Sequence, residues 1–208
     1  MPTDRNRQSV ISPRDADRAI YIDFEGFADH SPTLLGILIG DQFEQVVLDS
    51  ELTSAADAKG MRLSTVAAEA SQLQARSLGE QRVVVAYSQH ELNVLRTYAQ
   101  TEIGEVYRDA RKIAKRWINR LHPDAPIQEW TLKEFLKFIE HPRGNHLGFQ
   151  QSTARIRAVR DMLRKKRSYD ALTPVAKAKW TKLLDHNEID CRGMRALVQR
   201  AASELAAR

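Results

Sequence analysis

Hydrophobic residues in the first quarter of the chain follow the pattern of β-strands. Residues 18–27 are rich in β-branched and aromatic side chains and end near Gly26, which is typical of a strand that runs into a turn. Residues 34–40 are almost entirely apolar, as expected for a strand buried on both faces, and residues 43–48 form a third such segment. Because short links join the three segments, we predict an antiparallel meander.

The spacing of hydrophobic residues then changes to that of a helix. It predicts a helix over residues 55–78, with Gly79 where a C-terminal cap is expected. Residues 82–87 form a compact apolar strand. This strand, the helix and the first strand make a crossover unit, which places the fourth strand parallel to the first. A short helix over residues 91–100 and a weak fifth strand over residues 105–109 follow.

The second half of the chain is predicted to be mostly helical. The helices are expected at residues 110–121, 132–139, 154–167 and from 175 to about 191, with a continuation towards 205. The whole pattern predicts an α/β fold with a mixed five-stranded sheet flanked by helices. We expect a flexible lead-in over residues 1–18 and a single domain over residues 19–208, with a helical insertion at about 123–180.

Composition excludes several classes of protein. The chain has 208 residues, 42% of them hydrophobic, a formal net charge of +5 and one cysteine, Cys191. One cysteine excludes an internal disulfide framework and a cysteine-rich zinc module. No apolar stretch approaches the roughly 18 residues that a membrane span needs, and the start of the chain lacks the apolar core of a signal peptide. We therefore expect no membrane association and a cytoplasmic location.

Two carboxylates on the first predicted strand are the first candidates for chemistry. Asp23 and Glu25 are two residues apart, so both side chains project from the same face of an otherwise apolar strand. Like-charge repulsion and desolvation make this arrangement unfavourable. A divalent cation such as Mg²⁺ or Mn²⁺, which prefers hard oxygen ligands, would offset that penalty. The alternative is an ordinary strand end that faces solvent.

Further acids occur at two later positions. Glu91 follows the fourth strand, whose C-terminal end opens on the same sheet edge as the first strand. A simpler interpretation of Glu91 is an acid that complements a helix dipole. Asp190 lies four residues after His186, so both occupy one face of the last predicted helix. Taken alone, this pair is more often a surface contact.

Three segments together resemble the DEDD 3′–5′ exonuclease superfamily, which has the ribonuclease H-like fold. They are YIDFEGF at residues 21–27, AYSQHELNVL at 86–95 and HNEIDCR at 186–192. Within this superfamily the chain is most similar to the uncharacterised ribonuclease H-like domains associated with RecB-type nucleases, and the resemblance spans about residues 19–200. Two positions depart from the pattern. Glu91 stands where an aspartate is usual, and His186 occupies the spacing at which tyrosine is usual.

The resemblance implies a metal-dependent nuclease. Asp23, Glu25, Glu91 and Asp190 would hold two divalent cations, Mg²⁺ or Mn²⁺, and His186 would take or orient a proton near neutral pH. The implied reaction is hydrolysis of phosphodiester bonds from the 3′ end of single-stranded RNA or DNA. Two alternatives stay open. One is an endonuclease or structure-specific trimming enzyme. The other is a nucleic-acid-binding or partner-docking module whose catalysis the changes at Glu91 and His186 impair.

Basic residues supply candidate contacts to a nucleic acid. One cluster lies on the helix predicted at residues 154–167 and comprises Arg155, Arg157, Arg160, Arg164, Lys165, Lys166 and Arg167. A second cluster comprises Arg108, Arg111, Lys112, Lys115, Arg116 and Arg120. Such residues position a strand through its phosphates, although solvated helix faces explain the same charges. Tyr87 is a candidate for stacking on a base, with core packing as the alternative.

Overall fold

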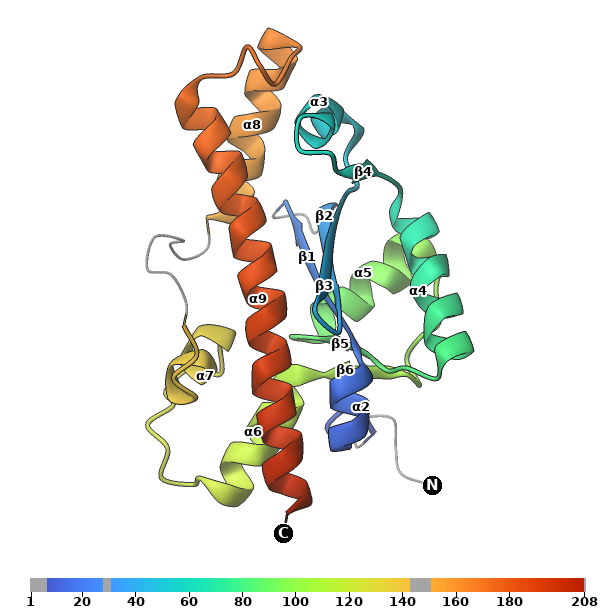
Figure 1. Cartoon of the computed structure of the whole chain (residues 1–208), viewed down its shortest axis with the longest axis vertical. Coiled ribbons are helices and arrows are strands. Elements are labelled where there is room, and N and C mark those ends of the chain that lie inside the picture. Colours follow the sequence, from blue (N-terminus) through green and yellow to red (C-terminus); the bar gives the residue numbers. More distant parts are fainter. Residues whose placement is uncertain (1–6, 28–30, 143–150, 208) are drawn as a thin grey trace.

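A mixed sheet of six strands forms the centre of the described structure, in the order β4-β3-β2-β1-β5-β6 (Figure 1). The computed structural model describes residues 7–27, 31–142 and 151–207. β1, β2 and β3 are antiparallel neighbours, β5 is parallel to β1, and β6 is parallel to β5. The predicted meander and parallel fourth strand are therefore confirmed. The strands are β1 (Ile20–Gly26), β2 (Pro32–Ile39), β3 (Gln42–Val47), β4 (Arg62–Leu63), β5 (Val84–Ala86) and β6 (Tyr107–Asp109).

Helices cover both faces of the sheet. α4 (Val66–Glu80) and α5 (Gln89–Ala99) pack on one face. The other face is covered by α9 (Pro174–Ala206), together with α2 (Pro13–Arg18), α6 (Ala110–Leu121) and α7 (Leu132–Phe138). α9 has 33 residues and runs along the whole length of the molecule (Figure 1). The first part of α9 packs beside α8 (Ser152–Lys166), near η1 (Ser50–Leu52) and α3 (Thr53–Asp57).

The alternation of side chains along β1 decides where its carboxylates point. Ile20, Ile22 and Phe24 are buried in the core beneath α4 and α5. Tyr21 is buried in the core beneath α9, and its hydroxyl donates a hydrogen bond to the Ala16 carbonyl oxygen at 2.7 Å. Since successive side chains of a strand point to opposite faces, Asp23 and Glu25 project on the side of α9. The prediction that these two carboxylates share a face is confirmed.

The single helix predicted over residues 55–78 is wrong. α3 ends at Asp57, and Gly60 adopts a left-handed conformation with φ of +62°. This conformation is unfavourable for residues with a Cβ atom and interrupts a helix. The chain then forms β4 beside β3, which adds a sixth strand to the five predicted, and α4 starts after the N-cap Thr65. α4 continues through Gly79 and ends at Glu80, and the C-cap Gln81 that follows has φ of +51°.

Part of the expected N-terminal lead-in is helical. Ser12 accepts a hydrogen bond from the backbone N–H of Asp15 and caps α2, in which Pro13 occupies the first turn. Ala16 is fully buried and α2 contacts α9. The expected lead-in therefore contains a helix at Pro13–Arg18, while residues 1–6 lie outside the described residues.

The predicted helical insertion at about 123–180 contains α7, α8 and the start of α9. Residues 143–150 of this insertion lie outside the described residues. The predicted continuation of the last helix is confirmed, because α9 is unbroken from Pro174 to Ala206. None of the helices in the described ranges combines the length and the apolar character that crossing a membrane requires.

Candidate functional site

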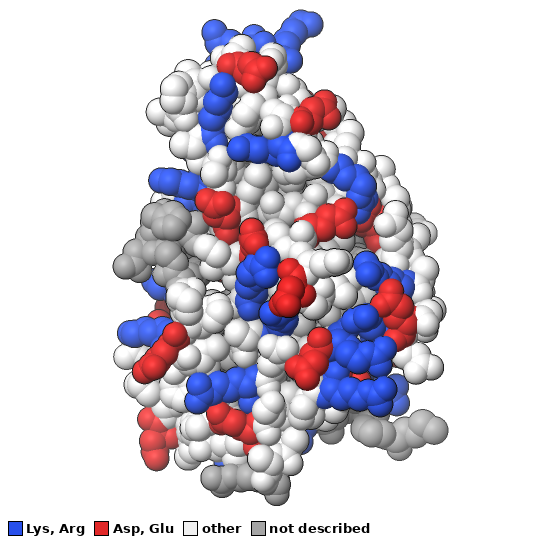
Figure 2. All heavy atoms as spheres, viewed as in Figure 1, with Lys and Arg blue, Asp and Glu red and all other residues white. Residues whose placement is uncertain are grey.

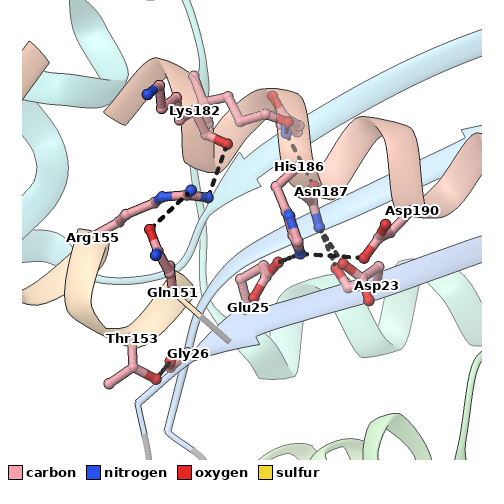
Figure 3. Close-up of polar contacts among 12 residues, drawn as sticks. Asp23, Glu25, Gly26, Gln151, Thr153, Arg155, Lys182, His186, Asn187 and Asp190 are labelled. Carbon is pink, nitrogen blue, oxygen red and sulfur yellow. Dashed lines mark hydrogen bonds and ion pairs between the residues drawn. The ribbon is translucent and has the colours of Figure 1, made fainter. Parts of the chain in front are cut away.

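Acidic residues from β1 meet a histidine and an acid from α9 in a seam between the sheet and this helix (Figure 3). His186 Nε2 lies 3.3 Å from Asp190 Oδ2 and 3.8 Å from Glu25 Oε1. The side chains of Glu25, His186 and Asp190 are only 13%, 12% and 17% exposed. The two predicted motifs, which are more than 160 residues apart in sequence, are therefore joined through one imidazole ring.

Asn187 fastens α9 to the sheet beside this seam. Its side-chain amide donates to Asp23 Oδ2 at 2.8 Å and to the Asp23 carbonyl oxygen at 3.0 Å. Its side-chain oxygen accepts a hydrogen bond at 3.0 Å from Gln45, whose amide also donates to the Leu184 carbonyl oxygen. Asn187 is completely buried, so this network satisfies polar groups that would otherwise be costly to bury.

Gly36 makes room for that network. Asp23 of β1 pairs with Gly36 of β2, and Gly36 pairs with Gln45 of β3, so the three residues form one row across the sheet. A Cβ atom on Gly36 would lie 2.3 Å from the Asn187 side-chain oxygen, closer than non-bonded atoms can approach. The hydrogen-bond partners on either side hold Asn187 in place, so the helix can approach this closely only over a glycine. Sequence analysis missed Gly36, Gln45 and the role of Asn187, because only the strand register brings them together.

Burial and mutual repulsion shape the protonation of the β1 carboxylates. Burial raises the pKa of Asp23 well above its ordinary value, as do the nearby charges of Glu25, Asp190 and Glu91, while the Asn187 hydrogen bond opposes this change. Burial likewise raises the pKa of Glu25 from 4.5 to about 7, and Asp190 and Glu91 add to the effect. The charges of Asp190 and Glu91 thus raise the pKa values of both β1 carboxylates, which indicates negative charge in a confined place.

Glu91 belongs to the same electrostatic cluster but also has a local structural role. It lies in the first turn of α5, where its Oε2 accepts from the Ser88 backbone N–H at 3.3 Å, and Ser88 in turn caps the helix. This is a capping box. Burial raises the pKa of Glu91 to about 7, with a contribution from Asp109. The expected opening of β1 and β5 on one edge therefore brings Glu91 into electrostatic range of Asp23 and Glu25.

The thiol of Cys191 lies within electrostatic range of all four acids. It is completely buried, and its pKa is raised well above the ordinary value by burial and by the charges of Asp23, Asp190, Glu25 and Glu91. The thiol is therefore held in its neutral form. This environment agrees with a packing role and disfavours thiolate chemistry.

Arg155, one of the side chains predicted to contact nucleic acid, lies buried beside the seam. Arg155 is 4% exposed and donates to the Lys182 carbonyl oxygen and to the side-chain oxygen of Gln151, both at 3.4 Å (Figure 3). Its positive charge lowers the pKa of Glu25, as does a hydrogen bond from Ser152. Contact of Arg155 with nucleic acid stays a prediction. Arg155 acts as a partial counter-charge to Glu25.

The remaining basic residues of α8 divide into two groups. Arg160 lies over the Phe27 ring and near Asp49 and Glu51, and Arg164 forms two hydrogen bonds of 2.8 and 2.7 Å with Glu51. These two arginines tie α8 to η1. The other residues are exposed and, within the described ranges, form no ion pair: Arg157, Lys165, Lys166 and Arg167. The end of α8 lies at the top of the view in Figure 2, where basic side chains extend outward.

Tyr87 is held by the protein itself. Its hydroxyl donates to the Trp130 carbonyl oxygen at 2.9 Å, and its ring packs against the core beneath α9. Core packing, the alternative considered from the sequence, accounts for these contacts. Stacking of Tyr87 on a base stays a prediction.

The chemistry of the seam is that of hard oxygen donors. In the described part of the chain, no three or more His, Cys, Asp or Glu side chains are grouped closely enough to hold a metal ion. Carboxylates that are buried and repel one another are nevertheless the donors that Mg²⁺ and Mn²⁺ prefer.

Comparison with protein-family models, with curated proteins and with solved structures finds no match for this chain.

The contact between Gly36 and Asn187 generates a stability prediction. Gly36→Ala is expected to lower the free energy of unfolding by about 1–3 kcal/mol, because its Cβ overlaps a buried and hydrogen-bonded side chain. Gly79→Ala is the matched control. Nothing lies within 4 Å of a Cβ at Gly79, which is inside α4, so this change should stabilise the protein slightly. Urea unfolding measures both. Equal stability of the two variants would contradict the close approach of α9.

The raised carboxyl pKa values generate a pH prediction. The folded state of the metal-free protein binds protons at Glu25 and Glu91 up to about pH 7, whereas the unfolded chain releases them near 4.5. The free energy of unfolding should therefore fall as pH rises from about 4.5 to about 7. Glu25→Gln should flatten this dependence by on the order of 1 kcal/mol, and Glu102→Gln, at a side chain 78% exposed, should not. Thermal unfolding across this range tests the prediction, which fails if both variants follow the unaltered protein.

Proposed function

We propose that this chain is a divalent-metal-dependent nuclease that hydrolyses phosphodiester bonds of single-stranded nucleic acid, most consistently as a 3′–5′ exonuclease. The observation that carries the proposal is that His186 Nε2 lies 3.8 Å from Glu25 and 3.3 Å from Asp190. The charges of Glu25, Asp190 and Glu91 each raise the pKa of the neighbouring Asp23. Such a cluster is unfavourable without a cation. A two-metal site for phosphodiester hydrolysis gives it a function.

The donor set fits Mg²⁺ or Mn²⁺. Asp23, Glu25, Glu91 and Asp190 would hold the cations through carboxylate oxygens. Two bound cations supply stabilisation of the attacking and leaving oxygens and make a water molecule more acidic. In the absence of cations, protonation of Glu25, whose pKa is raised to about 7, and the positive charge of the nearby Arg155 offset part of this negative charge.

His186 is suited to proton transfer at this site. Its Nε2 lies between Glu25 and Asp190, at 3.8 and 3.3 Å, so the carboxylates fix the direction of the ring. In this arrangement Nε2 donates to the carboxylate oxygens. Because an imidazole titrates near neutral pH, Nε2 could accept the proton of an attacking water once the carboxylates bind cations instead. Asn187 orients the Asp23 carboxylate through its 2.8 Å hydrogen bond and leaves the second oxygen of Asp23 for a ligand.

The arrangement of the sheet also supports the proposal. An antiparallel meander continues into parallel strands, as the resemblance to the ribonuclease H-like fold implies, and helices flank both faces. β1 and β5 end at the same edge, beside Glu25 and Glu91. Functional sites of open α/β sheets commonly lie at this edge.

The capping box at Glu91 favours a second candidate function. Because Glu91 Oε2 is already bonded to Ser88, it has less capacity to bind a cation. This constraint, together with histidine at position 186, would suit a ribonuclease H-like module that binds nucleic acid or a protein partner without efficient catalysis. The two functions differ in turnover and not in binding.

Cleavage of labelled single-stranded DNA and RNA tests the proposal. Turnover should require Mg²⁺ or Mn²⁺ and disappear in EDTA. Asp23→Asn and Asp190→Asn should each lower it by at least about 100-fold, because each removes a charged donor. The control is Asp161→Asn, at a half-exposed acid on α8 that pairs with Arg164 and, among the described residues, contributes no contact to the seam. Full activity in EDTA would refute the nuclease proposal, and metal-independent binding without turnover would favour the second function.

The products distinguish an exonuclease from an endonuclease. A strand labelled at its 5′ end should shorten one nucleotide at a time, because the proposed reaction releases nucleoside monophosphates from the 3′ end. A strand blocked at its 3′ end should be cut much more slowly. Internal fragments at the earliest times, with equal rates for the blocked and free strands, would instead identify an endonuclease or trimming enzyme.

A further inference from the structure

A pocket opens where β5 and β6 end and the helices α5 and α6 begin. Its volume is about 410 Å³, which suits a group of nucleotide size. It is lined by residues 88–90 on one side and by Asp109, Arg111, Lys112 and Lys115 on the other. None of these residues belongs to the four carboxylates described above, so the pocket is a separate feature of the same sheet edge.

Positive charge dominates the lining of this pocket. Three cationic side chains face a single acid, Asp109, which is 3% exposed and whose Oδ1 accepts from the Lys112 backbone N–H at 3.0 Å. Lys112 also donates to Gln8 at 2.7 Å. Within the described residues, Arg111 and Lys115 form no ion pair with an acid, so their charges are available to an anion.

The pocket is held in shape by its surroundings. The ammonium group of Lys115 lies over the Trp130 ring, 5.0 Å from its centre, and the carbonyl oxygen of Trp130 accepts the Tyr87 hydroxyl. Arg111 is exposed in the first turn of α6, directly after the cap formed by Asp109. Lys115 lies one helical turn further along the same side. Because Lys115 is already held against Trp130, it loses little side-chain entropy when it binds a phosphate.

Ser88 connects the pocket to the carboxylate seam. It lines the pocket, and its backbone N–H donates to Glu91 at 3.3 Å. If the scissile phosphate of a nucleic acid strand lies near Asp23 and Glu91, a neighbouring phosphate of the same strand would therefore lie in the pocket. Cations at this position also offset the repulsion between the carboxylates and a polyanion.

From this geometry we infer that the pocket between α5 and α6 binds a backbone phosphate of the nucleic acid strand, through Arg111 and Lys115. The inference rests on the proposed function, because it names how that site holds its substrate. It gives the second basic cluster of the sequence a specific role, carried by the two residues that line the pocket. Phosphate contacts of this kind set the position of the strand and carry little sequence information.

Binding in EDTA tests the inference without cleavage. A short dye-labelled single strand is titrated with the protein between about 50 and 200 mM salt, and its fluorescence anisotropy is followed. Arg111→Gln and the double variant Arg111→Gln/Lys115→Gln remove charge from the pocket. Arg116→Gln is the matched control, because Arg116 is an exposed arginine of α6 that does not line the pocket. Circular dichroism establishes that each variant is folded.

The pocket variants should bind more weakly and depend less on salt, with a slope reduced by about one for each phosphate that the protein no longer neutralises. Arg116→Gln should keep nearly the original slope. Equal effects of Arg111→Gln and Arg116→Gln, or no binding by the unaltered protein at low salt, would overturn the inference. Tight binding of inorganic phosphate or a nucleoside monophosphate, equal to that of the strand, would also overturn it and assign the pocket to a free phosphate compound.

This measurement separates the inference from the proposed function. A reduced salt slope in the pocket variants, in a protein without metal-dependent turnover, would retain the phosphate pocket and reject the nuclease. Metal-dependent turnover with an unchanged slope would retain the nuclease and reject the pocket.

Discussion

Negative charge confined between β1 and α9 is the constraint on which the candidate site depends. Asp23 and Glu25 point from the sheet towards α9, which presents His186 and Asp190 to them. The pKa values of Asp23 and Glu25 are raised by burial and by the charges of Asp190 and Glu91. A fold that needed only stability would place apolar side chains here, because isolated buried charge is unfavourable. We propose that a cationic ligand accounts for the retained charge, and the phosphodiester chemistry proposed above depends on that ligand.

The seam is built by a close approach of helix and sheet. Gly36 leaves space for Asn187, and the row formed by Asp23, Gly36 and Gln45 gives its side chain partners on both sides. Polar groups that are buried and fully bonded fix one arrangement, whereas apolar contacts tolerate sliding. This network therefore sets the position of α9 along the sheet and, with it, the distance of His186 and Asp190 from β1. A loss of this register would separate the two halves of the site without touching a carboxylate.

The sequence predicted those features that depend on local periodicity. Alternation along β1 gave the shared face of its two acids, and the crossover rule gave the parallel β5. It failed where a single backbone conformation or a distant contact decides the outcome. Gly60 breaks the predicted helix by adopting positive φ, and the burial of Arg155 beside Glu25 cannot be seen in a run of basic residues. Gly36 and Gln45 became recognisable only through strand register, which hydrophobic spacing does not specify for individual pairs.

Calorimetric titration with Mn²⁺ tests the central claim most directly. Because the pKa values of Glu25 and Glu91 are raised to about 7, cation binding near neutral pH must release protons. The measured heat should therefore vary with the ionisation enthalpy of the buffer. The account predicts saturable binding with proton release for the unaltered protein, and strongly weakened binding for Asp23→Asn. Absence of binding, or binding that Asp23→Asn leaves unchanged and that releases no protons, would contradict a cation site in this seam.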